Sequence, residues 1–259
     1  MGFLFPSSLV LHLSLSLSLK FSSVMYSGST MAVSKMCFSF SLFTVIFWVS
    51  LSSINGALPP SCKSIECPSY ATIHEGDGFE IRRYNFSLWM STSPIQDVSF
   101  VSATRTGFLE LFDYIQGKNK YGTKIEMTAP VMTEVFPSSG PFCASEFVVS
   151  FYVPGANQAD PPPAQGLQAQ KWVKKFAAVR QFGGFVSDYN IGQEASKLHA
   201  SLLGSKWSTA IAKSKSHDDK PDVFTVAQYN SPFEFSGRVN EIWLLFDMQD
   251  VSMHIKVTI

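Results

Sequence analysis

Apolar and polar residues alternate along several segments of the chain, which is typical of half-buried β-strands. The alternation, together with aromatic and β-branched residues, predicts three strands in the first half, over 79–92, 124–136 and 146–154. After the first of these strands, apolar residues recur at steps of three and four, which predicts a helix. Asp97 or Ser99 can cap the start of this helix, and Gly117 can end it.

The same order of elements returns in the second half. A strand is predicted over 171–187, and an apolar stripe from Ile191 to Leu202 predicts a second helix that stops at Gly204. Two further strands follow, over 224–235 and 241–246, while the polar stretches 157–166 and 213–222 are predicted loops. We therefore predict an α+β fold in which a duplicated strand–helix–strand–strand unit forms a distorted antiparallel β-barrel with two helices packed outside.

The stretch KIEMTAPVMTEV, residues 124–135, interrupts its own alternation with Pro130. Proline cannot donate to a sheet ladder, so it belongs at an edge or a bulge. Met127 and Met132 flank this kink, and methionine serves either as a filler of irregular core space or as a contact for a flat apolar ligand. The segment YNSPF, 229–233, has a proline at the matching place of the second half.

The first 57 residues differ in composition from the rest. LSLSLSL at 13–19 is what a repeated dinucleotide would encode, so residues 1–30 are either translated leader with the natural start at Met31 or a disordered Ser/Leu tail. From Met31, a lysine and an apolar run predict a signal peptide with cleavage near Ala57. We therefore expect the secretory pathway, with an extracellular or vacuolar destination; the alternative is a membrane anchor by an uncleaved signal.

The cysteines and one sequon fit an oxidising compartment. Cys62 and Cys67 lie close enough in sequence to form a disulfide, and Cys143 is then free; a pairing of Cys143 with either of them is the alternative. No second cysteine pair exists for a zinc site, and we predict no metal site. Asn85, in Asn85-Phe86-Ser87, is a candidate glycosylation site.

Composition and motifs narrow the class of function. The 259 residues have a net charge of zero with scattered Lys and Arg, which argues against a nucleic-acid partner. Apolar residues make up 46% of the chain and include 23 Phe, enough for a large core and an apolar groove. No nucleophile elbow, phosphate-binding loop or metalloprotease motif is present, so we predict no catalytic residues and no enzyme.

Several segments in order resemble the SOUL haem-binding family. They are GFEIRRY, YIQGKNKYGTKIEMTAPV, SGPFC, QFGGFVSD and YNSPFEFSGRVNEIWL. The resemblance covers about 62–247, and we take 58–247 as the SOUL-like domain, followed by an atypical, disordered tail over 248–259. It implies a barrel of two similar halves and a carrier of haem or another tetrapyrrole, with no membrane partner after signal removal. The alternative is a binding module for another apolar small molecule, or a protein-interaction scaffold without haem.

The resemblance also implies a groove along the first helix. The residues that map to it are Arg105, Phe108, Leu111, Phe112 and Met132. Arg105 would pair with a haem propionate, because guanidinium matches carboxylate geometry. The alternative is that the apolar members of this set face the barrel core.

The iron ligand stays unassigned. Arg83 occupies the place where one branch of the family has a proposed histidine ligand, and arginine stays protonated. The candidates of similar rank are His74, His199, His217, Tyr84 and the two methionines. Two positions where another branch has lysine are carboxylates here, Asp113 and Glu234, and their charge would oppose the propionates.

Arg238 and Glu241 lie three residues apart at the turn into the last strand. The spacing predicts a salt bridge that holds the strand in place. The alternative is that the two residues form part of a polar rim around a ligand.

Overall fold

The computed structural model describes residues 58–140, 143–215 and 223–248. The expected leader, the signal peptide with its cleavage site near Ala57, and all but the first residue of the expected tail lie outside the described residues. Met248, the last residue described, is exposed and belongs to no helix or strand.

The described residues form one sheet of ten strands and three α-helices. The strands are β1 (Ala71–Gly76), β2 (Phe79–Tyr84), β3 (Ser87–Thr92), β4 (Ile95–Asp97), β5 (Val131–Phe136), β6 (Ser145–Tyr152), β7 (Leu167–Trp172), β8 (Lys175–Gly183), β9 (Phe224–Gln228) and β10 (Val239–Phe246). The α-helices are α2 (Phe100–Ile115), α3 (Asn190–Leu202) and α4 (Lys206–Lys215). Short 3₁₀ helices lie at Pro60–Lys63 and Gly155–Asn157.

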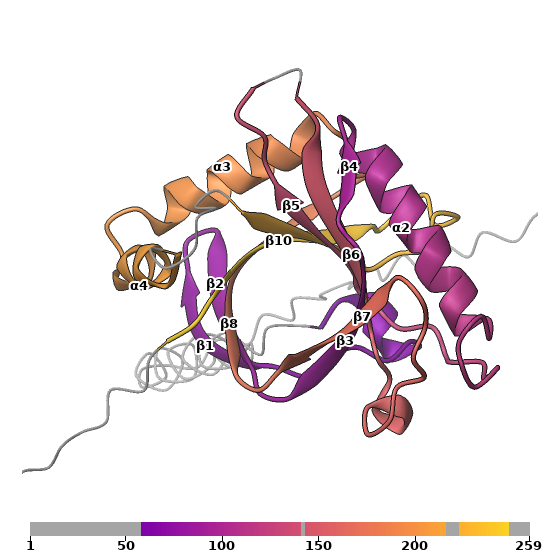
Figure 1. Ribbon diagram of the computed structural model, residues 1–259. Coiled ribbons are helices and arrows are strands. Elements are labelled where there is room, and N and C mark those ends of the chain that lie inside the picture. Colours follow the sequence, from indigo (N-terminus) through magenta and orange to yellow (C-terminus); the bar gives the residue numbers. More distant parts are fainter. Residues whose placement is uncertain (1–57, 141–142, 216–222, 249–259) are drawn as a thin grey trace, which may run out of the picture. The chain divides into compact units, whose positions relative to one another are not determined.

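The sheet curls into a distorted antiparallel barrel, as predicted (Figure 1). Its strand order is β1-β2-β8-β10-β9-β5-β6-β3-β7, and β4 pairs with β6. The two halves meet where β5 pairs with β9. Each half also contributes a strand to the other, because β2 pairs with β8 and β7 pairs with β3. This strand exchange makes one continuous sheet from the two repeats.

Alternation along the strands separates an interior core from two helix-covered cores. The interior cluster holds three tryptophans, Trp89, Trp172 and Trp243, with tyrosines around them. On the outer face, α3 and α4 cover β8 and β10, and α2 covers β6 (Figure 1). Because both faces are packed, β3 is buried along its whole length.

Four strand predictions were wrong in extent. Of the predicted strand 224–235, only Phe224–Gln228 is a strand. The predicted strand 79–92 is two strands that turn at Asn85-Phe86, and 171–187 is likewise divided between β7 and β8. Of 124–136, only Val131–Phe136 is a strand, and the Ala129–Pro130 peptide that precedes it is cis. Pro130 therefore lies just before a strand, where no ladder donor is required.

The second half contains one helix that was not predicted. α4 begins at Lys206, directly after the Gly204 stop of α3, and its last residues belong to the stretch 213–222 predicted as loop. Its buried face consists of little more than Trp207 and Ile211, which pack on the same outer cluster as α3. Such a short apolar stripe is a weak signal for a helix.

A charged network lies within the barrel wall, and it replaces the predicted Arg238–Glu241 salt bridge. Both terminal nitrogens of Arg82 donate to the Glu241 carboxylate at 2.9 Å, and the side chains are 2% and 0% exposed. Glu241 also accepts from Tyr229 Oη at 2.9 Å and from Trp243 Nε1 at 2.7 Å. The salt-bridge prediction failed because strand alternation turns Glu241 into the barrel, where β2 supplies its partner.

The N-terminal segment contacts the same interior. Cys62 and Cys67 form a disulfide, and the loop that they close packs against the interior cluster through Ile65 and the two cysteines. Cys143 is free and exposed. Asn85 is exposed at the turn between β2 and β3. No helix of the described ranges is both long and apolar enough to cross a bilayer.

Candidate functional site

Helix α2 forms one wall of an apolar groove. The Ser99 hydroxyl accepts from the Ser102 N–H at 3.1 Å and caps the helix, as the sequence predicted. At Gly107 the helix lies so close to the sheet that an added Cβ would be 2.4 Å from a methyl group of Val149 on β6. Gly107 belongs to the buried face of α2, which packs on the sheet. Thr104 and Phe108 are half-buried and lie at the edge of this face.

The groove has a volume of about 400 Å³. Its lining is Phe100, Val101, Thr104, Arg105, Phe108 and Leu109 from α2, Val131 at the start of β5, Val186 before α3, and Gln228, Asn230, Pro232 and Arg238 around the β9–β10 connection. This volume is near the lower end of the range for small-molecule pockets. A flat ligand would therefore be held by one face and an edge rather than enclosed.

The structure places the five residues predicted for the groove in three different settings. Arg105 and Phe108 line it. Phe112 does not line it but is 40% exposed one turn further along the helix, with its ring stacked on Phe108 at 5.8 Å between centroids. Phe108 in turn has an edge contact with Phe151 of the core, so one of its sides is committed to packing.

Leu111 and Met132 are corrections, because neither lines the groove. Leu111 is 0% exposed and continues the buried stripe of α2 one turn after Gly107. Met132 is 1% exposed inside the barrel, since alternation along β5 turns it away from its neighbour Val131, which does line the groove. The residue of β5 that lines the groove is Val131 rather than Met132.

Two arginines give the groove its positive charge. Arg105 is exposed on α2 and has no hydrogen-bond or ion-pair partner within the described ranges. Arg238 is mostly buried, and its Nη1 donates to the carbonyl oxygens of Ser231 at 2.8 Å and Glu234 at 2.7 Å. The Nε of Arg238 is buried with no hydrogen-bond partner among the described residues. Both guanidinium groups therefore have donors left for an anionic ligand group.

The two carboxylates expected to oppose a propionate lie outside the groove lining. Asp113 pairs with Lys118 at 2.6 Å on the exposed side of the helix end. Glu234 accepts from the Asn230 amide at 2.8 Å. Neither residue lines the groove, so the net charge of its lining is positive.

The lining offers no side chain of the kinds that ligate haem iron, since it contains no His, Cys, Met or Tyr. The earlier candidates lie elsewhere, and His217 is outside the described residues. His74 lies against Trp207, His199 is on α3, and Tyr84 is 1% exposed inside the barrel. Met127 packs against the core beneath α2. The lining thus combines apolar side chains with two cations and contains none of the usual ligands of haem iron.

The α+β barrel of two joined halves, with helices on its outer face, is the fold that the motif resemblance led us to expect. The chain belongs to the SOUL family: the family model "SOUL heme-binding protein" matches residues 65–245. The resemblance predicted from the motifs is confirmed.

Curated relatives agree with this assignment. The chain is 36% identical to human "Heme-binding protein 2" over 193 residues, which is 71% of this chain and 88% of the relative. It is 28% identical to "Heme-binding protein 1" of Xenopus laevis over 173 residues, or 66% and 85% of the two chains. Among solved structures, the "EcmrR C-terminal domain" matches with a TM-score of 0.42 and 11% identity, over 70% of this chain and 99% of that one.

Proposed function

We propose that this protein is a non-enzymatic carrier that binds haem or another tetrapyrrole in the groove along α2. The observation that supports this most strongly is the pairing of an apolar lining with two arginines whose donors are not all used. Val101, Leu109 and Phe108 would contact the porphyrin face, and Arg105 with Arg238 would hold the propionates. Family membership and the names of the relatives support the same ligand class.

Titration of the full chain with ferric haem tests the proposal through the Soret band. We expect a saturable shift at one equivalent. Leu109→Asp places a carboxylate in the lining and should weaken affinity about tenfold or more, because the charge must be desolvated beside the ring. Leu203→Asp is the matched control, since Leu203 is 78% exposed at the end of α3 and does not line the groove.

Arg105→Glu tests the propionate contact, and it should weaken binding by roughly tenfold, as expected for the loss of a hydrogen bond to a charged group. Iron-free protoporphyrin IX should bind about as well as ferric haem, because the lining holds no iron ligand. An unsaturable, linear absorbance, or equal affinity of the two leucine variants, would favour another apolar ligand or a scaffold role.

We further propose that the protein enters the secretory pathway. The Cys62–Cys67 disulfide and the exposed Asn85 of the sequon support an oxidising, glycosylating compartment. N-terminal sequencing of the secreted protein should begin near Leu58, and peptide-N-glycosidase should lower its apparent mass. Recovery of a peptide from residues 1–30 in the mature protein would contradict the expected processing.

A further inference from the structure

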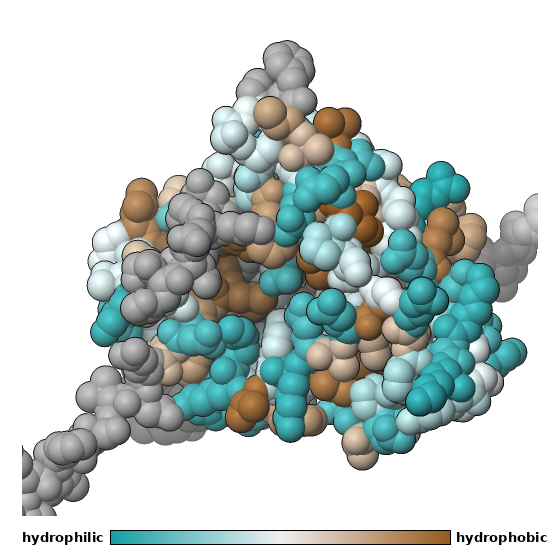
Figure 2. Space-filling view, in the orientation of Figure 1, coloured by the Kyte–Doolittle hydropathy of each residue, from teal (hydrophilic) through white to brown (hydrophobic). Residues whose placement is uncertain are grey.

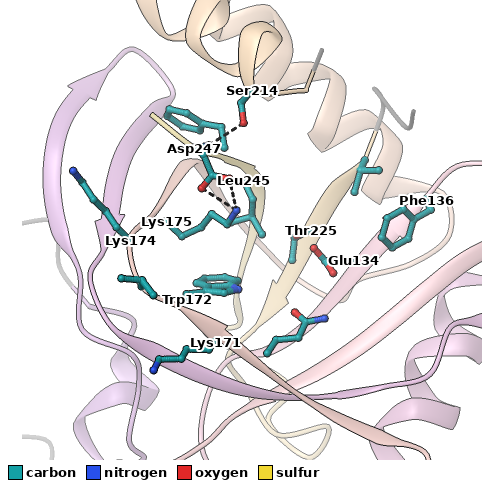
Figure 3. A pocket seen from close by; sticks show the side chains of 14 residues that line it. Glu134, Phe136, Lys171, Trp172, Lys174, Lys175, Ser214, Thr225, Leu245 and Asp247 are labelled. Carbon is teal, nitrogen blue, oxygen red and sulfur yellow. Dashed lines mark hydrogen bonds and ion pairs between the residues drawn. The ribbon is translucent and has the colours of Figure 1, made fainter. Parts of the chain in front are cut away.

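A second and larger cavity lies at the mouth of the barrel, and it shares no lining residue with the groove. Its volume is about 830 Å³, and strands β5, β7, β8, β9 and β10 all contribute to its walls (Figure 3). In the space-filling view the mouth is hollowed, with hydrophobic side chains at depth and hydrophilic ones around it (Figure 2). Tetrapyrrole binding in the groove gives this cavity no role.

A carboxylate without a direct hydrogen-bond or ion-pair partner among the described residues lies on the cavity wall. Glu134 on β5 is opposite Thr225 of β9 in the sheet register, and both side chains line the cavity (Figure 3). Glu134 has no hydrogen-bond or ion-pair partner within the part of the chain that the structure describes. Burial raises the pKa of Glu134 above its usual value, and the positive charge of Lys175 lowers it again in part. A carboxylate in this setting would be stabilised by a donor that a ligand supplies.

The lysines of the cavity are engaged elsewhere. Lys175 donates to both carboxylate oxygens of Asp247, at 3.0 and 2.9 Å (Figure 3). The Nζ of Lys171 lies 5.1 Å from the centre of the Phe86 ring, and that of Lys174 lies 5.9 Å from the centre of the Phe176 ring. No ion pair joins any of these lysines to Glu134 among the described residues, although the charge of Lys175 still acts on it.

The rest of the wall is suited to a flat apolar body. The Trp172 indole is 7% exposed and lies in the cavity wall, with Phe136 and Leu245 also lining it (Figure 3). An indole face attracts cations and stacks on planar groups, and its attraction for a cation adds to that of a nearby carboxylate. A wall that carries both Trp172 and Glu134 therefore favours a ligand with a positive charge as well as a flat shape.

We propose that the barrel mouth is a second ligand site, which binds a small organic monocation with a flat apolar body and an amidinium or ammonium head directed at Glu134. The engaged but nearby lysines set an upper limit on ligand charge, since a second positive group would lie against them. The site is independent of the tetrapyrrole groove, and either could exist without the other.

Three isosteric probes test the charge requirement in the full chain: 2-naphthamidinium, neutral 2-naphthamide and anionic 2-naphthoate. Isothermal titration at neutral pH should show saturable one-to-one binding of the amidinium, with the other two weaker by about tenfold or more, as the loss of a charged hydrogen bond implies. Equal binding of all three probes, or tightest binding of the naphthoate, would overturn the proposal. This series needs no variant and so does not depend on the folding of any.

Glu134→Gln keeps the shape of the side chain and removes its charge. It should abolish the preference for the amidinium over the amide and leave the ferric haem titration unchanged. Glu126→Gln is the matched control, because Glu126 is an exposed carboxylate that lines neither cavity. If Glu134→Gln binds the amidinium as tightly as the wild-type chain, the site does not use Glu134 and the assignment is wrong.

Discussion

The network around Glu241 gives a sharp test of how the barrel is stabilised. Glu241→Gln preserves volume but removes the charge that faces Arg82, and it replaces one carboxylate oxygen with an amide donor. The lost oxygen is either the acceptor for Arg82 Nη2 or the one shared by Arg82, Tyr229 and Trp243. Because both side chains are almost fully buried, water cannot replace the lost partner.

The magnitude follows from this geometry. Breaking a buried ion pair from one side costs about 3–5 kcal/mol. Glu80 also pairs with Arg82 and still neutralises part of its charge, so we expect a loss of about 3 kcal/mol in the free energy of unfolding. For a domain of this size, that corresponds to a fall of roughly 6–12 °C in Tm.

Urea unfolding followed by tryptophan fluorescence measures the effect, with the slope m expected to stay constant. Asp113→Asn is the control, because the Asp113–Lys118 pair is exposed and its loss should change stability by less than about 1 kcal/mol. Replacing both buried partners, as Arg82→Met with Glu241→Leu, should recover much of the loss. A Glu241→Gln variant as stable as the control would refute the view that this pair is a closed, desolvated unit.

Three further predictions concern packing, titration and the disulfide. Gly107→Ala should lower the free energy of unfolding, measured in urea, by about 1–3 kcal/mol, because its Cβ would overlap β6. Gly192→Ala is the control: an added Cβ there would have no atom within 4 Å, so the change should be neutral or stabilising by up to about 1 kcal/mol. Similar results for the two variants would contradict the close contact between α2 and the sheet. Since the pKa of Glu134 is raised in the folded state, the free energy of unfolding should fall as the pH rises from about 4.5 through that pKa. Glu134→Gln should therefore have a higher Tm than the wild type at pH 7 and the same Tm below about pH 4. A difference in Tm that does not depend on pH would contradict this. Replacing Cys62 and Cys67 by serine should cost about 2 kcal/mol in the same assay, the value for so short a loop, and an unchanged midpoint would show that the bond does not constrain the unfolded chain.

Capping and glycine residues predicted the helix ends correctly, whereas the strand boundaries were less evident from the sequence. The start and end of α2 were predicted well, because Ser99 caps the helix and Gly117 follows its end. The break at Asn85-Phe86 was missed, since both flanking strands are rich in aromatic and β-branched residues and β3 is buried on both faces, so its alternation gives no boundary. The division between β7 and β8 was missed for another reason, since neither Val173 nor Lys174, which separate the two strands, is a typical turn residue.

Only the wall of the groove that α2 forms could be predicted from the sequence. Arg105 and Phe108 follow from the helix pattern and the family resemblance. The opposite wall, with Gln228, Asn230 and Arg238, comes from the β9–β10 connection, and no sequence pattern places a loop against a helix so far away in the chain. The YNSPF motif was noted, but as a repeat of the proline kink rather than as a wall.

The exchange of β2 and β7 between the two halves has a consequence for the origin of the chain. A single ancestral repeat would have lacked one strand of its sheet. It would have exposed an unpaired edge strand, which is prone to aggregation. Such a repeat could have completed its sheet only by exchanging a strand with a second copy. The present chain therefore corresponds to a domain-swapped homodimer whose two copies are covalently linked. Severed halves should then be insoluble apart and reassemble only when refolded together.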